Sequence, residues 1–267
     1  MKRWQILTIG ILSVSCIAIG YALYSYYAPP AERQAYPIPR QNDDDTLRIA
    51  YIGDSWAAMH KDYDTMTERM VAARLHCPVK VQSFGVCGLT SKEIYINLFD
   101  NPHMKSFMQQ GFDFCFISAG INDTYKKMSA TYYKASMDGI IQFMLTNEIH
   151  PIILEIPDYN IQKAYDRQTS TRKVLRQVSM IITRTPMDCK EQFRHVLHEL
   201  ITEKGYEGKV SILPYKSWNG NYTIHQRLLY LNDGLHLNTN GYKRLDAMIV
   251  SLLADVFCHR SFSGTPW

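Results

Sequence analysis

The chain has 267 residues, of which 46% are hydrophobic and 20% charged, and its formal net charge is +4. These fractions are those of an ordinary globular protein and exclude a disordered or low-complexity chain. The positive charge is small and dispersed, without a basic stripe interleaved with aromatic residues, so no nucleic-acid partner is expected. The chain beyond residue 46 is long enough for one globular domain, which we place at residues 46–267.

Residues 1–27 are predicted to be an N-terminal membrane anchor or signal segment. Lys2 and Arg3 precede a stretch without charge at residues 4–27, and roughly 20 apolar residues suffice to span a bilayer. A cleaved signal has a shorter apolar region of about 7 to 15 residues, which favours an uncleaved helix. Cleavage after Ala22 and lipidation at Cys16 are the alternatives. The flanking basic residues predict a domain outside the cytoplasm, periplasmic or at the cell surface.

Residues 28–45 are predicted to be a Pro-rich linker. The stretch holds Pro29, Pro30, Pro37 and Pro39 and ends in three consecutive Asp residues. Such a composition cannot bury enough apolar area to fold, so we expect an extended tether.

Five short, largely apolar runs follow, at residues 47–52, 79–84, 112–118, 150–156 and 210–214. Their length and composition are typical of buried parallel strands. Helix-like stretches lie between them at residues 65–75, 91–99 and 131–147, and a last helix is expected at residues 241–257. This alternation predicts an α/β protein with a parallel sheet between two helical layers.

Residues 158–208 are predicted to be a helical insertion between the fourth and fifth strands. Its two helices are expected around residues 171–183 and 189–204, where they could wall or cover a cleft. Four aromatic residues occupy loops around it: Tyr159, Tyr165, Trp218 and Tyr222. Aromatic faces suit sugar rings, but they also dominate core packing, and both interpretations stay open.

Four short motifs lie just after predicted strands or before the last helix. They are Gly-Asp-Ser at residues 53–55, Gly-Val-Cys-Gly-Leu-Thr at 85–90, Gly-Ile-Asn-Asp at 120–123 and Asp-Gly-Leu-His at 233–236. Serine is a poor nucleophile unless a base activates it and a carboxylate orients that base. Glycine N–H groups and a neutral Asn side chain are parts that an oxyanion hole requires. Together the motifs indicate a hydrolase.

These motifs, in this order, resemble those of the SGNH hydrolases, also called the GDSL esterase/lipase superfamily. The resemblance implies a flavodoxin-like five-stranded parallel sheet of order 2-1-3-4-5 and no cofactor. It also implies that Ser55 is the nucleophile, that Asp233 and His236 complete the triad, and that Gly88 and Asn122 are oxyanion donors with the N–H of Ser55. Two residues depart from the family pattern: Ser83 replaces a frequent Asn, and Leu237 replaces a common Pro.

The remaining histidines do not form a predicted metal site. His195 and His198 lie on one helix face with Glu199. Two histidines and one acid make a weak metal site, so a solvent-exposed helix face is favoured. No Asp or Glu stands three residues before His225, as Asp233 stands before His236. His60, shortly after the Gly-Asp-Ser motif, is expected at the surface or the rim of the cleft.

Cysteine and arginine positions add two expectations. Five cysteines lie outside the N-terminal segment, so at least one is unpaired in a monomer, and Cys115 is expected in the core. Basic residues gather between residues 167 and 184, at Arg167, Arg172, Lys173, Arg176 and Arg184. A solvated helix face is favoured for them over contact with an acidic glycan.

The sequence therefore predicts an extracytoplasmic serine esterase, most similar to enzymes that remove O-acetyl groups from carbohydrates. The expected partners are an acylated carbohydrate or another small ester. The alternatives are an O-acyltransferase with the same acyl-enzyme, a lipase or thioesterase, and a glycan-binding module without catalysis. The presence of Ser55, Asn122, Asp233 and His236 argues against the last.

Overall fold

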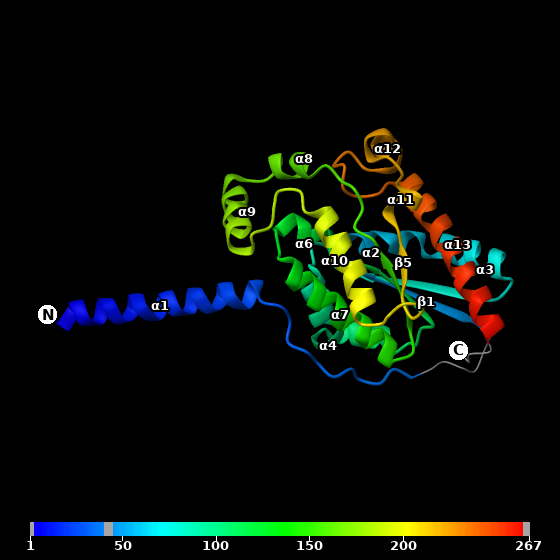
Figure 1. Ribbon diagram of the computed structural model, residues 1–267, viewed down its shortest axis with the longest axis horizontal. Coiled ribbons are helices and arrows are strands. Elements are labelled where there is room, and N and C mark those ends of the chain that lie inside the picture. The colour runs from blue at the N-terminus through cyan, green and yellow to red at the C-terminus, as the bar shows by residue number, and fades with distance from the viewer. Residues whose placement is uncertain (1–2, 40–44, 264–267) are drawn as a thin grey trace.

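The computed structural model describes residues 3–39 and 45–263 and begins with helix α1 (Arg3–Tyr27). Figure 1 shows α1 extending away from the rest of the molecule. Its described side chains are exposed and mostly apolar, as at Ile11, Ile17 and Tyr24. Within the two described ranges, however, no helix combines the length and the apolarity needed to cross a membrane. The predicted membrane anchor is thus not supported.

The described chain folds around one parallel sheet. Its strands are β1 (Leu47–Gly53), β2 (Val79–Gly85), β3 (Phe114–Ser118), β4 (His150–Leu154) and β5 (Ser211–Leu213). They lie in the order β2-β1-β3-β4-β5, and every neighbouring pair is parallel. β3 and β4 are buried along their whole length because helices cover both faces of the sheet. The predicted fold class and strand order are confirmed.

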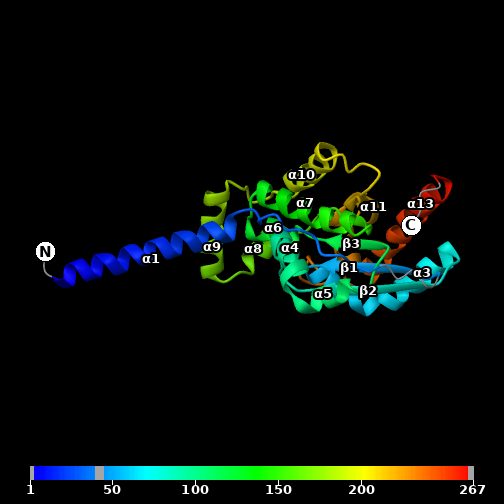
Figure 2. The same ribbon diagram turned by 90° about the horizontal axis from the view of Figure 1, so that it is seen from below.

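Two helical layers enclose the sheet (Figures 1 and 2). On one face α3 (Asp64–Leu75) packs against α13 (Thr239–Ser263). On the other face α7 (Ala130–Thr146) lies between α4 (Ser91–Asp100) and α10 (Lys190–Glu203). The carboxyl ends of β1 and β3 meet where the chain order of the strands reverses, which is where ligands bind in doubly wound sheets.

The remaining helical segments lie between or outside these elements. They are α2 (Ser55–His60), the 3-10 turn η1 (Lys61–Tyr63), α5 (Pro102–Met108), α6 (Ile121–Lys126), α8 (Ile161–Asp166), α9 (Ser170–Thr183), α11 (Tyr215–Trp218) and α12 (Tyr222–Leu229).

The predicted insertion at residues 158–208 needs a correction. It contains a third helix, α8, and its last helix belongs to the core. α10 packs on α7 and buries Phe193, Leu197 and Leu200, so it is a helix of the main layer. α8 and α9 lie outside these layers, and α9 lies beside the end of α1 in both views (Figures 1 and 2).

Residues 28–39 form no helix or strand, as expected of a linker, but they lie on the domain. Tyr36 packs between Phe99 of α4 and Phe143 of α7, with ring centroids 6.1 and 5.0 Å away. The N–H of Ile38 donates to Asn147 Oδ1 at 2.8 Å. We call residues 28–39 the strap. Residues 40–44 of the predicted linker lie outside the described residues.

Candidate active site

The first motif places Ser55 at the start of α2, directly after β1. Gly53 has φ of +150°, and a Cβ there would lie 2.1 Å from the carbonyl oxygen of Ser118 on β3. Only glycine allows β1 and β3 to approach so closely at this turn. Asp54 is the N-cap of α2, because its side chain accepts from the N–H of Trp56 at 3.0 Å. The turn therefore presents Ser55 at the carboxyl end of the sheet.

Ser55, His236 and Asp233 form one hydrogen-bonded chain. His236 Nε2 lies 2.9 Å from Ser55 Oγ, and His236 Nδ1 lies 2.6 Å from Asp233 Oδ2. The other carboxylate oxygen of Asp233 accepts the N–H groups of Leu235 and His236 at 2.9 and 3.0 Å. The structure thus brings together the three residues predicted as a triad, across 181 residues of sequence.

The carboxylate of Asp233 is held in its ionised form. Burial by itself would raise its pKa, but the hydrogen bonds from the His236 ring and from the two backbone N–H groups lower the pKa below its ordinary value. An ionised acceptor keeps the proton of His236 on Nδ1, which leaves Nε2 free to accept the proton of Ser55 Oγ.

Gly88 and Asn122 follow β2 and β3, the two neighbours of β1 in the sheet, and both line a cavity of about 470 Å³. Gly88 follows β2 with φ of +82°, a left-handed conformation that favours glycine. Asn122 lies in the first turn of α6, after β3, and its Nδ2 donates to Asp54 Oδ2 at 3.3 Å. One N–H of the amide remains for a further acceptor.

Two buried carboxyl groups support these loops. Burial raises the pKa of Asp54 to about 7, although the N–H of Trp56 works against the shift. Burial likewise raises the pKa of Asp123 to about 6. Asp123 accepts from the N–H and the hydroxyl of Ser91 at 2.8 and 2.6 Å, and so ties the Asn122 loop to the start of α4. The last residue of the third motif is therefore structural.

The prediction that His60 lies at the surface or rim was wrong. Only 1% of His60 is exposed, and its Nε2 lies 3.0 Å from Asp246 Oδ1 on α13. On the other side, Nδ1 lies 2.9 Å from Ser83 Oγ and 3.1 Å from Asp64 Oδ1. Ser83, the departure from the family pattern, is thus part of a buried polar network that joins α2, β2, α3 and α13.

The other histidines lie outside the site. His195 pairs with Glu199 at 3.1 Å on an exposed helix face, His198 pairs with Glu155 at 2.9 Å, and His225 Nδ1 lies 2.8 Å from the carbonyl oxygen of Asn219. Within residues 3–39 and 45–263, no group of three His, Cys, Asp or Glu side chains could hold a metal ion.

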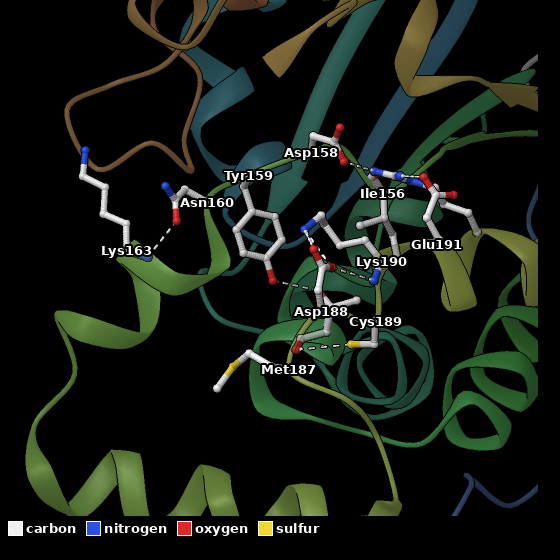
Figure 3. Close-up of polar contacts among 12 residues, drawn as sticks. Ile156, Asp158, Tyr159, Asn160, Lys163, Met187, Asp188, Cys189, Lys190 and Glu191 are labelled. Carbon is white, nitrogen blue, oxygen red and sulfur yellow. Dashed lines mark hydrogen bonds and ion pairs between the residues drawn. The ribbon is translucent and has the colours of Figure 1, made fainter. Parts of the chain in front are cut away.

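Two of the four loop aromatics are core residues. Trp218 is fully buried and packs edge-on against Trp56, with centroids 5.5 Å apart. Tyr159 is 3% exposed and points inward toward α6, where its hydroxyl lies 2.9 Å from Thr124 Oγ1 (Figure 3). The Tyr222 hydroxyl donates to the carbonyl oxygen of Gly234 at 2.7 Å and braces the Asp233 loop. Tyr159 and Trp218 therefore offer no free face to a sugar.

The described cysteines are free. Cys115 is fully buried on β3, as predicted, and burial raises the pKa of its thiol well above the ordinary range. Cys77, Cys87 and Cys189 also carry free thiols. The side chain of Cys258 lies outside the described residues.

Neither a protein-family model nor a curated protein sequence matches the chain, but solved structures do. A lipase/acylhydrolase from Enterococcus faecalis superimposes with a TM-score of 0.57 at 18% identity, over 78% of this chain and 96% of that one. The acetyl xylan esterase AlAXEase gives 0.54 at 14% identity, over 78% and 100%. A protein of Parabacteroides merdae described as a GDSL-like lipase gives 0.54 at 15%, over 82% and 100%. The chain therefore has the fold of the SGNH hydrolases.

Proposed function

We propose that the protein is a serine esterase of the SGNH type, with Ser55 as nucleophile, His236 as base and Asp233 as the orienting carboxylate. The observation that carries the proposal is the continuous chain of hydrogen bonds from Ser55 Oγ through the His236 ring to Asp233, 2.9 and 2.6 Å long. Each group has the neighbour that its role requires, at hydrogen-bonding distance.

In the proposed reaction, Ser55 Oγ attacks the ester carbonyl carbon while His236 Nε2 takes the hydroxyl proton. The carbonyl oxygen becomes an oxyanion, which accepts hydrogen bonds from the N–H groups of Ser55 and Gly88 and from the free N–H of Asn122. When the tetrahedral intermediate collapses, His236 returns the proton to the departing alkoxide. The Ser55 acyl ester remains, and a water molecule, deprotonated by His236, hydrolyses it to the carboxylic acid.

We further propose that the physiological ester is an O-acetyl group on a carbohydrate. Two observations support this choice. The cavity at Asn122 is lined by polar side chains, among them Gln168 and Arg172, as well as by apolar ones. One solved structure of the same fold is an acetyl xylan esterase. The location outside the cytoplasm stays a prediction from the N-terminal sequence.

Acetate release from O-acetylated oligosaccharides tests the proposal. The wild-type chain should release free acetate and leave a deacetylated sugar, whereas Ser55→Ala should release none above background. An acyltransferase, which forms the same acyl-enzyme, would instead transfer the label from a 14C-acetyl donor to an added glycan. Transfer without net acetate release would therefore refute hydrolysis while keeping Ser55 as nucleophile.

A further inference from the structure

Arg176 of α9 is a buried cation without a hydrogen-bond partner in the described part of the chain. Only 3% of the residue is exposed, and none of its three guanidinium nitrogens has a hydrogen-bond partner among the residues that the structure describes. A buried charge is costly unless hydrogen bonds and an opposite charge compensate it. Burial accordingly lowers the pKa of Arg176 below its ordinary value.

Arg194 shows what a satisfied buried arginine looks like in the same protein. Its Nε donates to the carbonyl oxygen of Ile156, and its two terminal nitrogens donate to Asp158 and Glu191, each at 2.7 Å. The three residues that carry these acceptors, Ile156, Asp158 and Glu191, lie close together in Figure 3. Arg176 has no such set, so its bonding capacity is left for something outside the described chain.

Two tyrosine rings lie close to the guanidinium of Arg176. Its Cζ lies 4.8 Å from the ring centroid of Tyr125 on α6 and 5.3 Å from that of Tyr165 on α8. Rings at these distances hold a guanidinium by cation–π attraction and leave the N–H groups at its edge, in the plane of the guanidinium. The group is therefore preorganised to bind a planar or tetrahedral oxyanion through two parallel hydrogen bonds.

Arg176 lines the same cavity of about 470 Å³ as Gly88 and Asn122. Arg172, one turn earlier on α9, and Gln168 also line it, and the Oε1 atom of Gln168 is buried without a partner in the described chain. Tyr26 of α1 closes one side, where Tyr27 is bonded to Ser179 of α9 at 2.5 Å. An ester bound at Asn122 would thus extend toward two arginines.

From this juxtaposition we propose that the cavity is an anion subsite, in which Arg176 binds a carboxylate or phosphate group of the ester substrate. The inference deepens the proposed esterase and rests on it for the placement of the ester. The substrate is then an acylated acidic sugar, and a neutral ester of the same size is a poor substrate.

Binding to Ser55→Ala tests the subsite without turnover. The probes are glucuronate, glucose 6-phosphate and glucose, titrated by calorimetry into the full chain. At least one of the two anionic sugars should bind ten or more times tighter than glucose. Comparing glucuronate with glucose 6-phosphate shows whether a carboxylate or a phosphate is preferred. Adding Arg176→Gln should abolish the preference. Lys173→Gln is the matched control, because Lys173 lies on the same helix, contacts Tyr165 and does not line the cavity. Equal affinities for all three sugars would overturn the subsite, and so would equal losses of anionic-sugar affinity in Arg176→Gln and Lys173→Gln.

Kinetics separate this proposal from the one on which it rests. For O-acetylated glucuronic acid, Arg176→Gln should raise KM about tenfold at nearly constant kcat. For the acetylated glucose of the same substitution pattern, both constants should stay within twofold of wild type. For the acid, the KM of Arg176→Lys should lie between those of wild type and Arg176→Gln, because lysine keeps the charge but lacks the two parallel N–H donors of the guanidinium. Equal losses on acid and neutral esters in both variants would show a merely structural arginine. Anion binding by a chain that hydrolyses no ester would refute the esterase and retain the subsite.

Discussion

Asn122 Nδ2 lies 3.3 Å from Asp54 Oδ2, so the residue before the proposed nucleophile holds one N–H of the proposed oxyanion donor. The contact joins the loops after β1 and β3 and fixes the rotation of the amide. Its second N–H is then directed without further reorganisation, which is what makes an oxyanion donor effective.

Asn122→Ala should lower kcat by about 10² to 10³, or roughly 3 to 4 kcal/mol, with little change in KM, because the bond forms only in the transition state. Asn122→Asp should be at least as harmful, since a carboxylate would face the developing negative charge. Steady-state kinetics on a small acetyl ester measure both. Turnover near wild type in either variant would make Asn122 structural.

His60→Gln should destabilise the fold by about 3 to 5 kcal/mol, because it leaves the buried carboxylate of Asp246 without its charged partner. The kcat of the folded fraction should stay near wild type, since the His60 network does not touch Ser55. Urea unfolding followed by circular dichroism gives the free energy of unfolding. An unchanged urea midpoint would contradict the structural role of this histidine.

The contribution of His60 should also depend on pH. Burial would lower its pKa, but the hydrogen bonds and charges of Asp246 and Asp64 outweigh burial, and the pKa is raised above its ordinary value of 6.5. The folded protein therefore binds this proton more tightly than the unfolded chain. The resulting stability is fully present below about pH 6.5 and is lost as the pH rises through the raised pKa. The difference in unfolding free energy between wild type and His60→Gln should accordingly be larger at pH 5.5 than at pH 9. A difference that grows with pH would contradict a raised pKa of His60 in the folded protein.

The strap should stabilise the domain although it lacks regular structure. A chain beginning at residue 46 should be less stable by about 2 to 3 kcal/mol than one beginning at residue 29, because it loses the packing of Tyr36 and the hydrogen bond of Ile38. The ion pair of Arg33 and Asp100, 2.5 Å long, is exposed and should add little. Tyr36→Ala in the longer chain should reproduce part of the loss. Equal melting temperatures of the two truncated chains would show a passive tether.

The sheet could be predicted well from the sequence, because buried parallel strands appear there as short apolar runs that end in turn residues. The strand order and the meeting of Ser55 with His236 were implied by the resemblance of the four motifs to those of the SGNH hydrolases. What could not be predicted depends on contacts between distant segments. His60 looks like a surface residue until Asp246, 186 residues later, is brought beside it. Arg176 looks like one basic residue on a solvated helix until the fold brings Tyr125 and Tyr165 next to its guanidinium.

The central claim is that Ser55 is the activated nucleophile, and covalent labelling tests it most directly. A fluorophosphonate probe should add one label to the wild-type chain, located at Ser55 by peptide mass spectrometry. Ser55→Ala should remain unlabelled while keeping the wild-type circular dichroism spectrum and melting temperature. His236→Ala should label far more slowly, because nothing then removes the proton from Ser55 Oγ. Labelling that persists in Ser55→Ala, or that maps to another residue in the wild type, would contradict the account.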